Sequence, residues 1–389
     1  GDIDVKENDK IILSVPYEVN VRKFSLPERF SQAFLAPDPG LLRETYGMDT
    51  GFKFECRPKL VKGEIVIPEF ATPGFQRRIE KCRSLNLRYI TMCSFHVGSG
   101  PGPGPFLGAE PGTEEYFRLV REYLQKVYDK FKQHELHHNL RFYVYDEPTL
   151  KELPLIKEVA KVVRGIDPEI LIYGAIYINS WKAMDEEARM LIDGWWTGYG
   201  SYTPEFLRWA RAHNKTVMAG FNCGSRHPFP SLFIDHPALS PRVISWINWK
   251  YGIDIITTWH TYHTVHSPDP YINPATFSHY NGDGVLIYPS GPNKRKPWNV
   301  PSIRLELLRE GMADYEYFKI LASLIEAAPP GPGREQAAET LRLAESLVTD
   351  ARTFCREPEP YRRTRRQMAD AIEQLHKHNA STVTEYDKP

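Results

Sequence analysis

The chain has 389 residues, and its 49 lysine and arginine residues balance 49 aspartate and glutamate residues, so the formal net charge is zero. That length is enough for one large domain with additions, and the balanced charge offers no field that would attract nucleic acid or an anionic membrane surface. Aromatic residues make up 12% of the chain, including 8 Trp and 21 Tyr, which suits a site that stacks on the apolar face of a neutral ligand such as a sugar.

The cysteines are odd in number, lie far apart and form no CxxC or His-spaced cluster, so neither a zinc site nor a disulfide framework is expected. We expect no cofactor. No apolar run reaches the roughly 18 residues that a membrane helix needs, and no signal peptide opens the sequence. These features predict a soluble protein without membrane insertion and favour a cytoplasmic location. The cysteines are Cys56, Cys82, Cys93, Cys223 and Cys355.

Residues 1–27 contain short strand-like pieces at 11–15 and 19–21, typical of the tail of a β-domain or of a strand on the flank of a barrel. From residue 28 onward, strands and helices alternate, which is the pattern of a parallel sheet. Eight such strands make a closed (β/α)8 (TIM) barrel over residues 28–325 the economical fold. The predicted strands are residues 30–35, 63–67, 87–95, 141–145, 170–177, 192–198, 216–223 and 253–262.

Helical spacing of apolar residues predicts the helices between these strands. Residues 282–289 resemble a further strand or hairpin arm outside the eight, and a helix at 302–324 follows. Charged amphipathic helices at 335–352 and 362–378 predict a helical C-terminal appendage and tail over residues 326–389. The helices predicted within the barrel are residues 41–46, 76–84, 114–134, 150–164, 180–190, 204–213 and 241–251.

Two acids, Asp146 and Glu147, end the fourth predicted strand, and Pro148 after them cannot donate to a sheet ladder. In a (β/α)8 barrel, the C-terminal ends of the strands carry the chemistry. The alternative for Asp146 and Glu147 is that they have no catalytic role and that the strand simply runs into a solvated turn.

The Gly- and Pro-rich run at 98–108 follows the third predicted strand. It predicts either a loop that shapes a pocket or a surface loop without function.

Other strand ends supply aromatic and polar side chains that suit a saccharide, which needs hydrogen bonds to its hydroxyls and an aromatic surface for its C–H face. No Gly-x-Ser-x-Gly elbow indicates a serine hydrolase, and no Gly-rich loop with a Lys-Ser/Thr ending indicates phosphate binding. A metal centre is not favoured, because the His residues at 260, 263 and 266 follow a strand rather than lying on a helix. The candidate substrate-binding residues are His96, Tyr177, Trp196, Tyr199, Asn222, Trp259 and Tyr262.

Three motifs together resemble the catalytic domain of glycoside hydrolase family 123: Tyr-Asp-Glu-Pro at 145–148, Gly-Asp-Gly at 282–284 with Tyr-Pro at 288–289, and residues 302–311 with 314–317. The resemblance covers roughly residues 25–320. It implies a (β/α)8 barrel that releases β-linked N-acetylgalactosamine from glycolipids or oligosaccharides with retention. It also implies that Glu147 is the general acid/base and that Asp146 holds the 2-acetamido group of the substrate.

The residues are consistent with that mechanism on their own terms. Retaining glycosidases of the usual kind place two carboxyls about 5 to 5.5 Å apart on opposite sides of the anomeric carbon. Neighbours at one strand end cannot easily do so, and the acetamido oxygen is then the expected nucleophile, with ionised Asp146 offsetting the positive charge that develops. Two alternatives stay open. One is an inverting hydrolase whose base is Asp193, Asp254 or Asp283, and the other is a catalytically silent carbohydrate-binding barrel.

Overall fold

The structure, a computed structural model, describes residues 1–35, 39–49, 51–54, 56–92, 104–220, 226–277, 280–289 and 299–386. Its centre is a parallel eight-stranded sheet in which the strands follow one another in chain order and the last pairs with the first. The backbone N–H of Phe34 donates to the carbonyl of Asp49 across 2.8 Å, which brings the two edge strands together and leaves the barrel nearly closed. The predicted (β/α)8 barrel is confirmed. Its strands are β3 (Ala33–Leu35), β4 (Gly51–Lys53), β7 (Tyr89–Thr91), β8 (Leu140–Asp146), β9 (Leu171–Ala175), β10 (Gly194–Thr197), β11 (Thr216–Gly220) and β12 (Ile255–Thr257).

The second predicted strand was wrong. Residues 63–67 lie in a two-stranded hairpin outside the barrel, β5 (Lys59–Val61) with β6 (Glu64–Val66), whose two-residue turn has positive φ at Lys62 and Gly63. The second barrel strand is β4 instead. It is only three residues long and begins with glycine, so it carries no strand pattern that could be recognised in the sequence.

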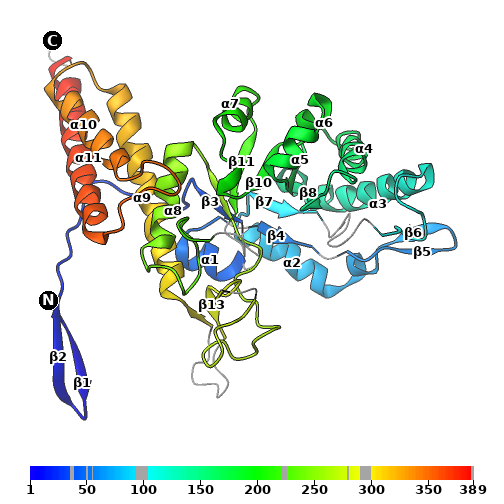
Figure 1. The fold of residues 1–389 in the computed structure, drawn as a ribbon, viewed down its shortest axis with the longest axis horizontal. Coiled ribbons are helices and arrows are strands. Elements are labelled where there is room, and N and C mark those ends of the chain that lie inside the picture. Colours follow the sequence, from blue (N-terminus) through cyan, green and yellow to red (C-terminus); the bar gives the residue numbers. More distant parts are fainter. Residues whose placement is uncertain are drawn as a thin grey trace.

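Helices surround the barrel, as Figure 1 shows. The longest of those before the last strand, α3, begins after Thr113, whose hydroxyl accepts a hydrogen bond from the N–H of Tyr116. Acidic residues in its first turn and basic residues in its last complement the helix dipole. Its buried residues recur at helical spacing and face the barrel. The helices up to the last barrel strand are α1 (Pro39–Tyr46), α2 (Pro73–Ser84), α3 (Glu114–Lys132), α4 (Leu153–Arg164), α5 (Ile178–Ala183), α6 (Glu186–Leu191), α7 (Pro204–Ala212) and α8 (Ser240–Tyr251), with 3₁₀ turns at Pro68–Ala71, His137–Asn139 and Tyr199–Ser201.

The single helix predicted at 180–190 is two helices, α5 and α6. Met184, between them, has an extended backbone, and the carboxylate of Asp185 accepts a hydrogen bond from the N–H of Ala188 across 2.7 Å. Asp185 is therefore the N-cap of a new helix, a role for which aspartate is strongly preferred. The position of the break follows from this cap.

The helices that follow the last barrel strand pack on α8 and on one another. Asp314 on α9 (Ile303–Ala327) accepts hydrogen bonds from Arg242 on α8, at 2.6 and 3.1 Å, and from the indole N–H of Trp246 at 2.8 Å. Arg365 on α11 (Pro358–Tyr386) lies 3.4 Å from the same carboxylate. A Cβ on Gly311 would lie 2.5 Å from the carbonyl oxygen of Arg242, so the close approach of α8 and α9 requires glycine there. α10 (Pro332–Ser346) packs on α9 and α11.

A two-stranded antiparallel hairpin, β1 (Asp2–Glu7) with β2 (Lys10–Pro16), opens the chain, and every residue in it is exposed. Figure 1 shows it projecting away from the barrel. The chain then reaches α11, where Arg22 is paired with Asp370 at 2.5 Å. Near the other end of the barrel region, β13 (Ile287–Tyr288) pairs with β14 (Val300–Pro301) just before α9. The limits proposed for the three regions, 1–27, 28–325 and 326–389, remain predictions.

Candidate active site

Strand β8 contains a β-bulge just before its two acids. In its pairing with β9, Tyr143 lies opposite Tyr173 but Asp146 lies opposite Ala175, so three steps along β8 match two along β9. Side chains of a regular strand alternate between its two faces, and the extra residue therefore brings Tyr143 and Asp146 to the same face. Tyr173 lines a cavity inside the barrel, so this is the inner face.

The hydroxyl of Tyr143 donates a hydrogen bond to Oδ1 of Asp146 across 2.7 Å. Burial, and then the negative charge of Asp146, raise the pKa of Tyr143 well above its usual value. The phenol therefore stays protonated and acts as a permanent donor. It occupies one oxygen of Asp146 and orients that carboxylate at the end of the strand. The sequence did not indicate Tyr143, because without the bulge residues 143 and 146 would face opposite sides.

Glu147 follows with a backbone φ of +54°, an uncommon conformation for a residue other than glycine. Its N–H donates to the carbonyl of Ala175 in β9 at 2.9 Å, which holds this conformation in place. The exposed side chain accepts a hydrogen bond at Oε1 from the hydroxyl of Tyr177, 2.7 Å away. Tyr177, 42% exposed, lies just beyond the end of β9. The structure thus brings Asp146, Glu147 and Tyr177 together at the C-terminal ends of two adjacent strands.

The two adjacent tryptophans on β10 point in opposite directions. Trp195 is fully buried against Phe206 and Trp209 of α7, outside the barrel. Trp196 packs with the cluster inside the barrel, and its ring centroid lies 6.0 Å from that of Tyr143. A Cβ on Gly220 would lie 2.2 Å from the indole nitrogen of Trp196, so glycine at the end of β11 makes room for this side chain.

Tyr199 lies beyond the end of β10 but is only 7% exposed. Its ring stacks on Phe229, with centroids 5.2 Å apart and planes 9° from parallel. The structure therefore places Tyr199 in packing around the barrel rather than beside Asp146 and Glu147. Two further candidates, His96 and Asn222, lie outside the described residues, as does most of the Gly- and Pro-rich run at 98–108.

Strand β12 lies four strands from β8 in either direction around the barrel, so residues that follow it face the two acids across the mouth. Trp259 lies in a bend two residues after the end of β12, where its side chain is partly buried. Its indole N–H donates to Oδ1 of Asp283 at 3.0 Å. The N–H of Tyr262 donates to Nδ1 of His260 at 2.9 Å, which places the ring proton of neutral His260 on Nε2. Burial, and then neighbouring His263, lower the pKa of His260 and favour this neutral form.

The three acids considered as distant bases occupy different places. Asp193 and Asp254 precede β10 and β12, so both lie at the N-terminal end of the barrel, away from Glu147. Asp193 pairs with Arg164, and Asp254 accepts a hydrogen bond from Tyr315 at 2.8 Å. Of these three acids, Asp283 is at the C-terminal end, where it is 3% exposed and bonded to Trp259.

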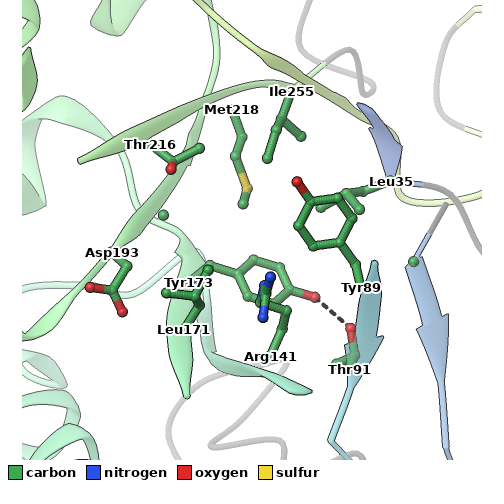
Figure 2. A pocket seen from close by; sticks show the side chains of 12 residues that line it. Leu35, Tyr89, Thr91, Arg141, Leu171, Tyr173, Asp193, Thr216, Met218 and Ile255 are labelled. Atoms are coloured by element: carbon green, nitrogen blue, oxygen red, sulfur yellow. Dashed lines mark hydrogen bonds between the residues drawn. The ribbon is translucent and has the colours of Figure 1, made fainter. Parts of the chain in front are cut away.

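A cavity of about 110 Å³ lies inside the barrel, and most of its lining residues lie at the start of a strand or next to it. Figure 2 shows Arg141, Tyr173 and Met218 pointing into this space, with the hydroxyls of Tyr173 and Thr91 hydrogen-bonded at 2.9 Å. The cavity is therefore at the opposite end of the barrel from the two acids. Within the described residues, no group of three or more His, Cys, Asp or Glu side chains could hold a metal ion, and no helix is both long and apolar enough to cross a membrane.

Comparison with known proteins identifies the family of this barrel. The family model for the catalytic domain of glycoside hydrolase 123 matches residues 92–321. Among solved structures, a family 123 glycoside hydrolase from Clostridium perfringens, studied for glycolipid glycan hydrolysis, is similar at a TM-score of 0.58 and 15% identity, covering 89% of this chain and 65% of that one. The chain therefore spans about two thirds of the length of that relative. No curated protein matches the sequence.

A chitinase domain from Pyrococcus furiosus is less similar, with a TM-score of 0.42 and 11% identity, covering 74% of this chain and 98% of that one. A GH53 catalytic domain from Ignisphaera aggregans has the same TM-score of 0.42 and 11% identity, covering 76% of this chain and 99% of that one. The family match defines this chain as a glycoside hydrolase, and the similar solved structure agrees with its barrel fold. More particularly, it belongs to glycoside hydrolase family 123, because the family model covers more than half of its residues.

Proposed function

We propose that this enzyme is a retaining exo-glycosidase that releases β-linked N-acetylgalactosamine from glycolipids or oligosaccharides, with the substrate's 2-acetamido group as nucleophile. The observation that carries the proposal is the pairing of adjacent acids on one strand end, with Asp146 oriented from inside the barrel by Tyr143. The galacto configuration and the glycolipid class rest on the family and on its Clostridium perfringens member.

In the first step, Glu147 gives its proton to the glycosidic oxygen while the acetamido oxygen attacks the anomeric carbon, and the bond to the aglycone breaks. A bicyclic oxazolinium ion results. Asp146 accepts the acetamido N–H and offsets the positive charge that develops there. In the second step, Glu147 as carboxylate takes a proton from a water molecule that attacks the anomeric carbon and reopens the ring. Two inversions at one carbon give net retention.

The hydrogen bonds of the site support this division of roles. The Tyr143 hydroxyl binds Oδ1 of Asp146, and the other carboxylate oxygen, Oδ2, is the one proposed to accept the acetamido N–H. The Tyr177 hydroxyl binds Oε1 of Glu147, and a protonated carboxyl can accept this bond on its carbonyl oxygen. The remaining proposed substrate contacts are Trp259 as the sugar platform, with Tyr262, Trp196, His96 and Asn222 as further candidates, whereas the buried Tyr199 is no longer one of them.

The test is a matched pair of aryl β-glycosides, one of N-acetylgalactosamine and one of galactose with a 2-hydroxyl. We expect turnover of the first and none of the second, a first-formed product of β configuration by NMR, and tight inhibition by a thiazoline mimic of the cyclised sugar. No turnover of any aryl glycoside would favour a binding protein. Good turnover of the 2-hydroxy sugar, or an inverted product, would promote an inverting mechanism with Asp283 as the candidate base.

A further inference from the structure

The turn Gly282-Asp283-Gly284 is enclosed between Arg304 and Trp259. Its two glycines have φ values of +75° and +70°. A Cβ on Gly282 would lie 2.7 Å from Nη1 of Arg304, and one on Gly284 would lie 2.7 Å from Cζ2 of Trp259. Glycine is therefore required at both positions by backbone conformation and by the close approach of these two side chains.

Arg304 fixes the turn from the side of the C-terminal helices. It lies in the first turn of α9 and is 6% exposed. Its guanidinium donates to the carbonyl of Gly282 at 2.9 Å and also to the carbonyl of Val285. The hydroxyl of Thr276 donates to the carbonyl of Asp283 at 2.7 Å. Two carbonyls within the turn and one just after it thus accept hydrogen bonds from buried donors, which leaves the turn little freedom to move.

Asp283 connects this fixed turn to the indole of Trp259. The 3.0 Å hydrogen bond from the indole N–H to Oδ1 of Asp283 fixes the orientation of the five-membered ring. The backbone of Gly284 lies against the six-membered ring of the same indole. The rings of Phe277 and His263 are packed around the same indole, with centroids 4.6 and 4.7 Å away. The indole is therefore held on its edge by a carboxylate and around its sides by packing.

We propose that Asp283 and Gly284 are positioning residues that fix the indole of Trp259 as a sugar platform across the barrel mouth from Asp146 and Glu147. This inference rests on the proposed function, because the platform matters only if the site binds a sugar. A ring already held in its binding orientation does not have to be ordered when the sugar arrives, so the arrangement favours affinity. The Gly-Asp-Gly motif then acts through Trp259 rather than on the reacting bond.

The kinetic test uses two independent ways of releasing the indole. Asp283→Ala removes the acceptor, and Gly284→Ala inserts a methyl group against the ring. Each should lower kcat/KM on the aryl N-acetylgalactosaminide about tenfold or more, mainly through KM, by comparison with other hydrogen bonds to charged groups. Asp283→Asn keeps an acceptor oxygen and should restore most of the loss. Gly63→Ala is the matched control, because Gly63 also has positive φ (+82°) but open space around it.

Double variants separate positioning from a general structural effect. Trp259→Phe removes both the indole N–H and the Cζ2 atom, so Asp283→Ala and Gly284→Ala should cost little more in that background. Additive losses would overturn the inference. A loss in kcat for Asp283→Asn as large as that for Asp283→Ala would also overturn it, since a catalytic base cannot be replaced by an amide.

A readout without turnover distinguishes failure of this inference from failure of the proposed function. The indole N–H resonance of Trp259, assigned with Trp259→Phe, should shift in Asp283→Ala and also when N-acetylgalactosamine is added to the unaltered enzyme. If sugar binds and shifts this resonance but no aryl glycoside is hydrolysed, the proposed function fails and the platform stands. If added sugar leaves the resonance unmoved, the platform is refuted.

Discussion

Tyr143→Phe tests whether the bulge in β8 matters for catalysis. The substitution removes only the hydroxyl that donates to Asp146, while the ring keeps its packing beside Tyr173 and Trp196. Phenylalanine fills nearly the same volume, so the fold should be retained. What changes is the orientation of the carboxylate that is proposed to receive the acetamido N–H.

The size of the effect follows from the type of bond. A hydrogen bond to a charged group is worth about 1.5 to 3 kcal/mol. Asp146 is only partly buried, so water can replace part of what is lost, and the lower half of that range applies. A loss of about 1.5 to 2 kcal/mol corresponds to about 10- to 30-fold in rate.

The measurement is kcat and KM on an aryl β-N-acetylgalactosaminide, with thermal melting as a check on folding. Tyr173→Phe is the control, because it removes a hydroxyl that also lies inside the barrel but is bonded to Thr91 instead of to an acid. We expect the loss in kcat for Tyr143→Phe and near-normal kinetics for Tyr173→Phe. Unchanged kcat in Tyr143→Phe, or equal losses in both variants, would refute the reasoning.

Three further predictions follow from the site and the scaffold. Glu147→Gln should cost about 10²- to 10⁴-fold on natural glycosides but less on an aryl substrate with a good leaving group, and equal losses on both would argue against the acid role. Tyr177→Phe should lower kcat by about 2- to 10-fold, the worth of a modest hydrogen bond at an exposed site, and a larger effect on KM alone would indicate a substrate contact instead. Asp314→Ala should lower the free energy of unfolding by about 3 to 5 kcal/mol, because it leaves Arg242 buried without its partner, and an unchanged urea midpoint would contradict this.

The barrel could be predicted from the sequence because seven of its eight strands lie in segments rich in apolar or aromatic residues that alternate with helices. The exception, β4, has three residues and a glycine, and its pairing with β7 comes from the closing of the barrel rather than from local preference. The hairpin β5–β6 has a more typical strand sequence than β4, and residues 63–67 were therefore predicted as the second barrel strand. At this point of the chain, the packing of the whole barrel outweighs local strand propensity in determining which segment joins the sheet.

The positions of the two acids and of Trp259 at the mouth of the barrel were predictable, because the acids end one strand and Trp259 follows another. Tyr143 was not, since an alternating pattern carries no sign of the extra residue between it and Asp146. Asp283 was considered only as a distant base, although in the structure its carboxylate accepts a hydrogen bond from an indole. Such contacts join residues 24 apart in the chain and depend on how two loops meet, which spacing alone does not reveal.

The positive φ of Glu147 has a practical consequence for anyone who wants an inert enzyme that still holds its substrate for crystallography. Glycine and asparagine accept a left-handed backbone readily, whereas valine, isoleucine and threonine resist it because of their branched Cβ. A substrate-trapping variant at this position is therefore best made with glycine or asparagine, which keep the chain path through the bulge and the link to Ala175. A β-branched replacement would move the neighbouring Asp146 as well, and the trapped complex would then show a distorted site.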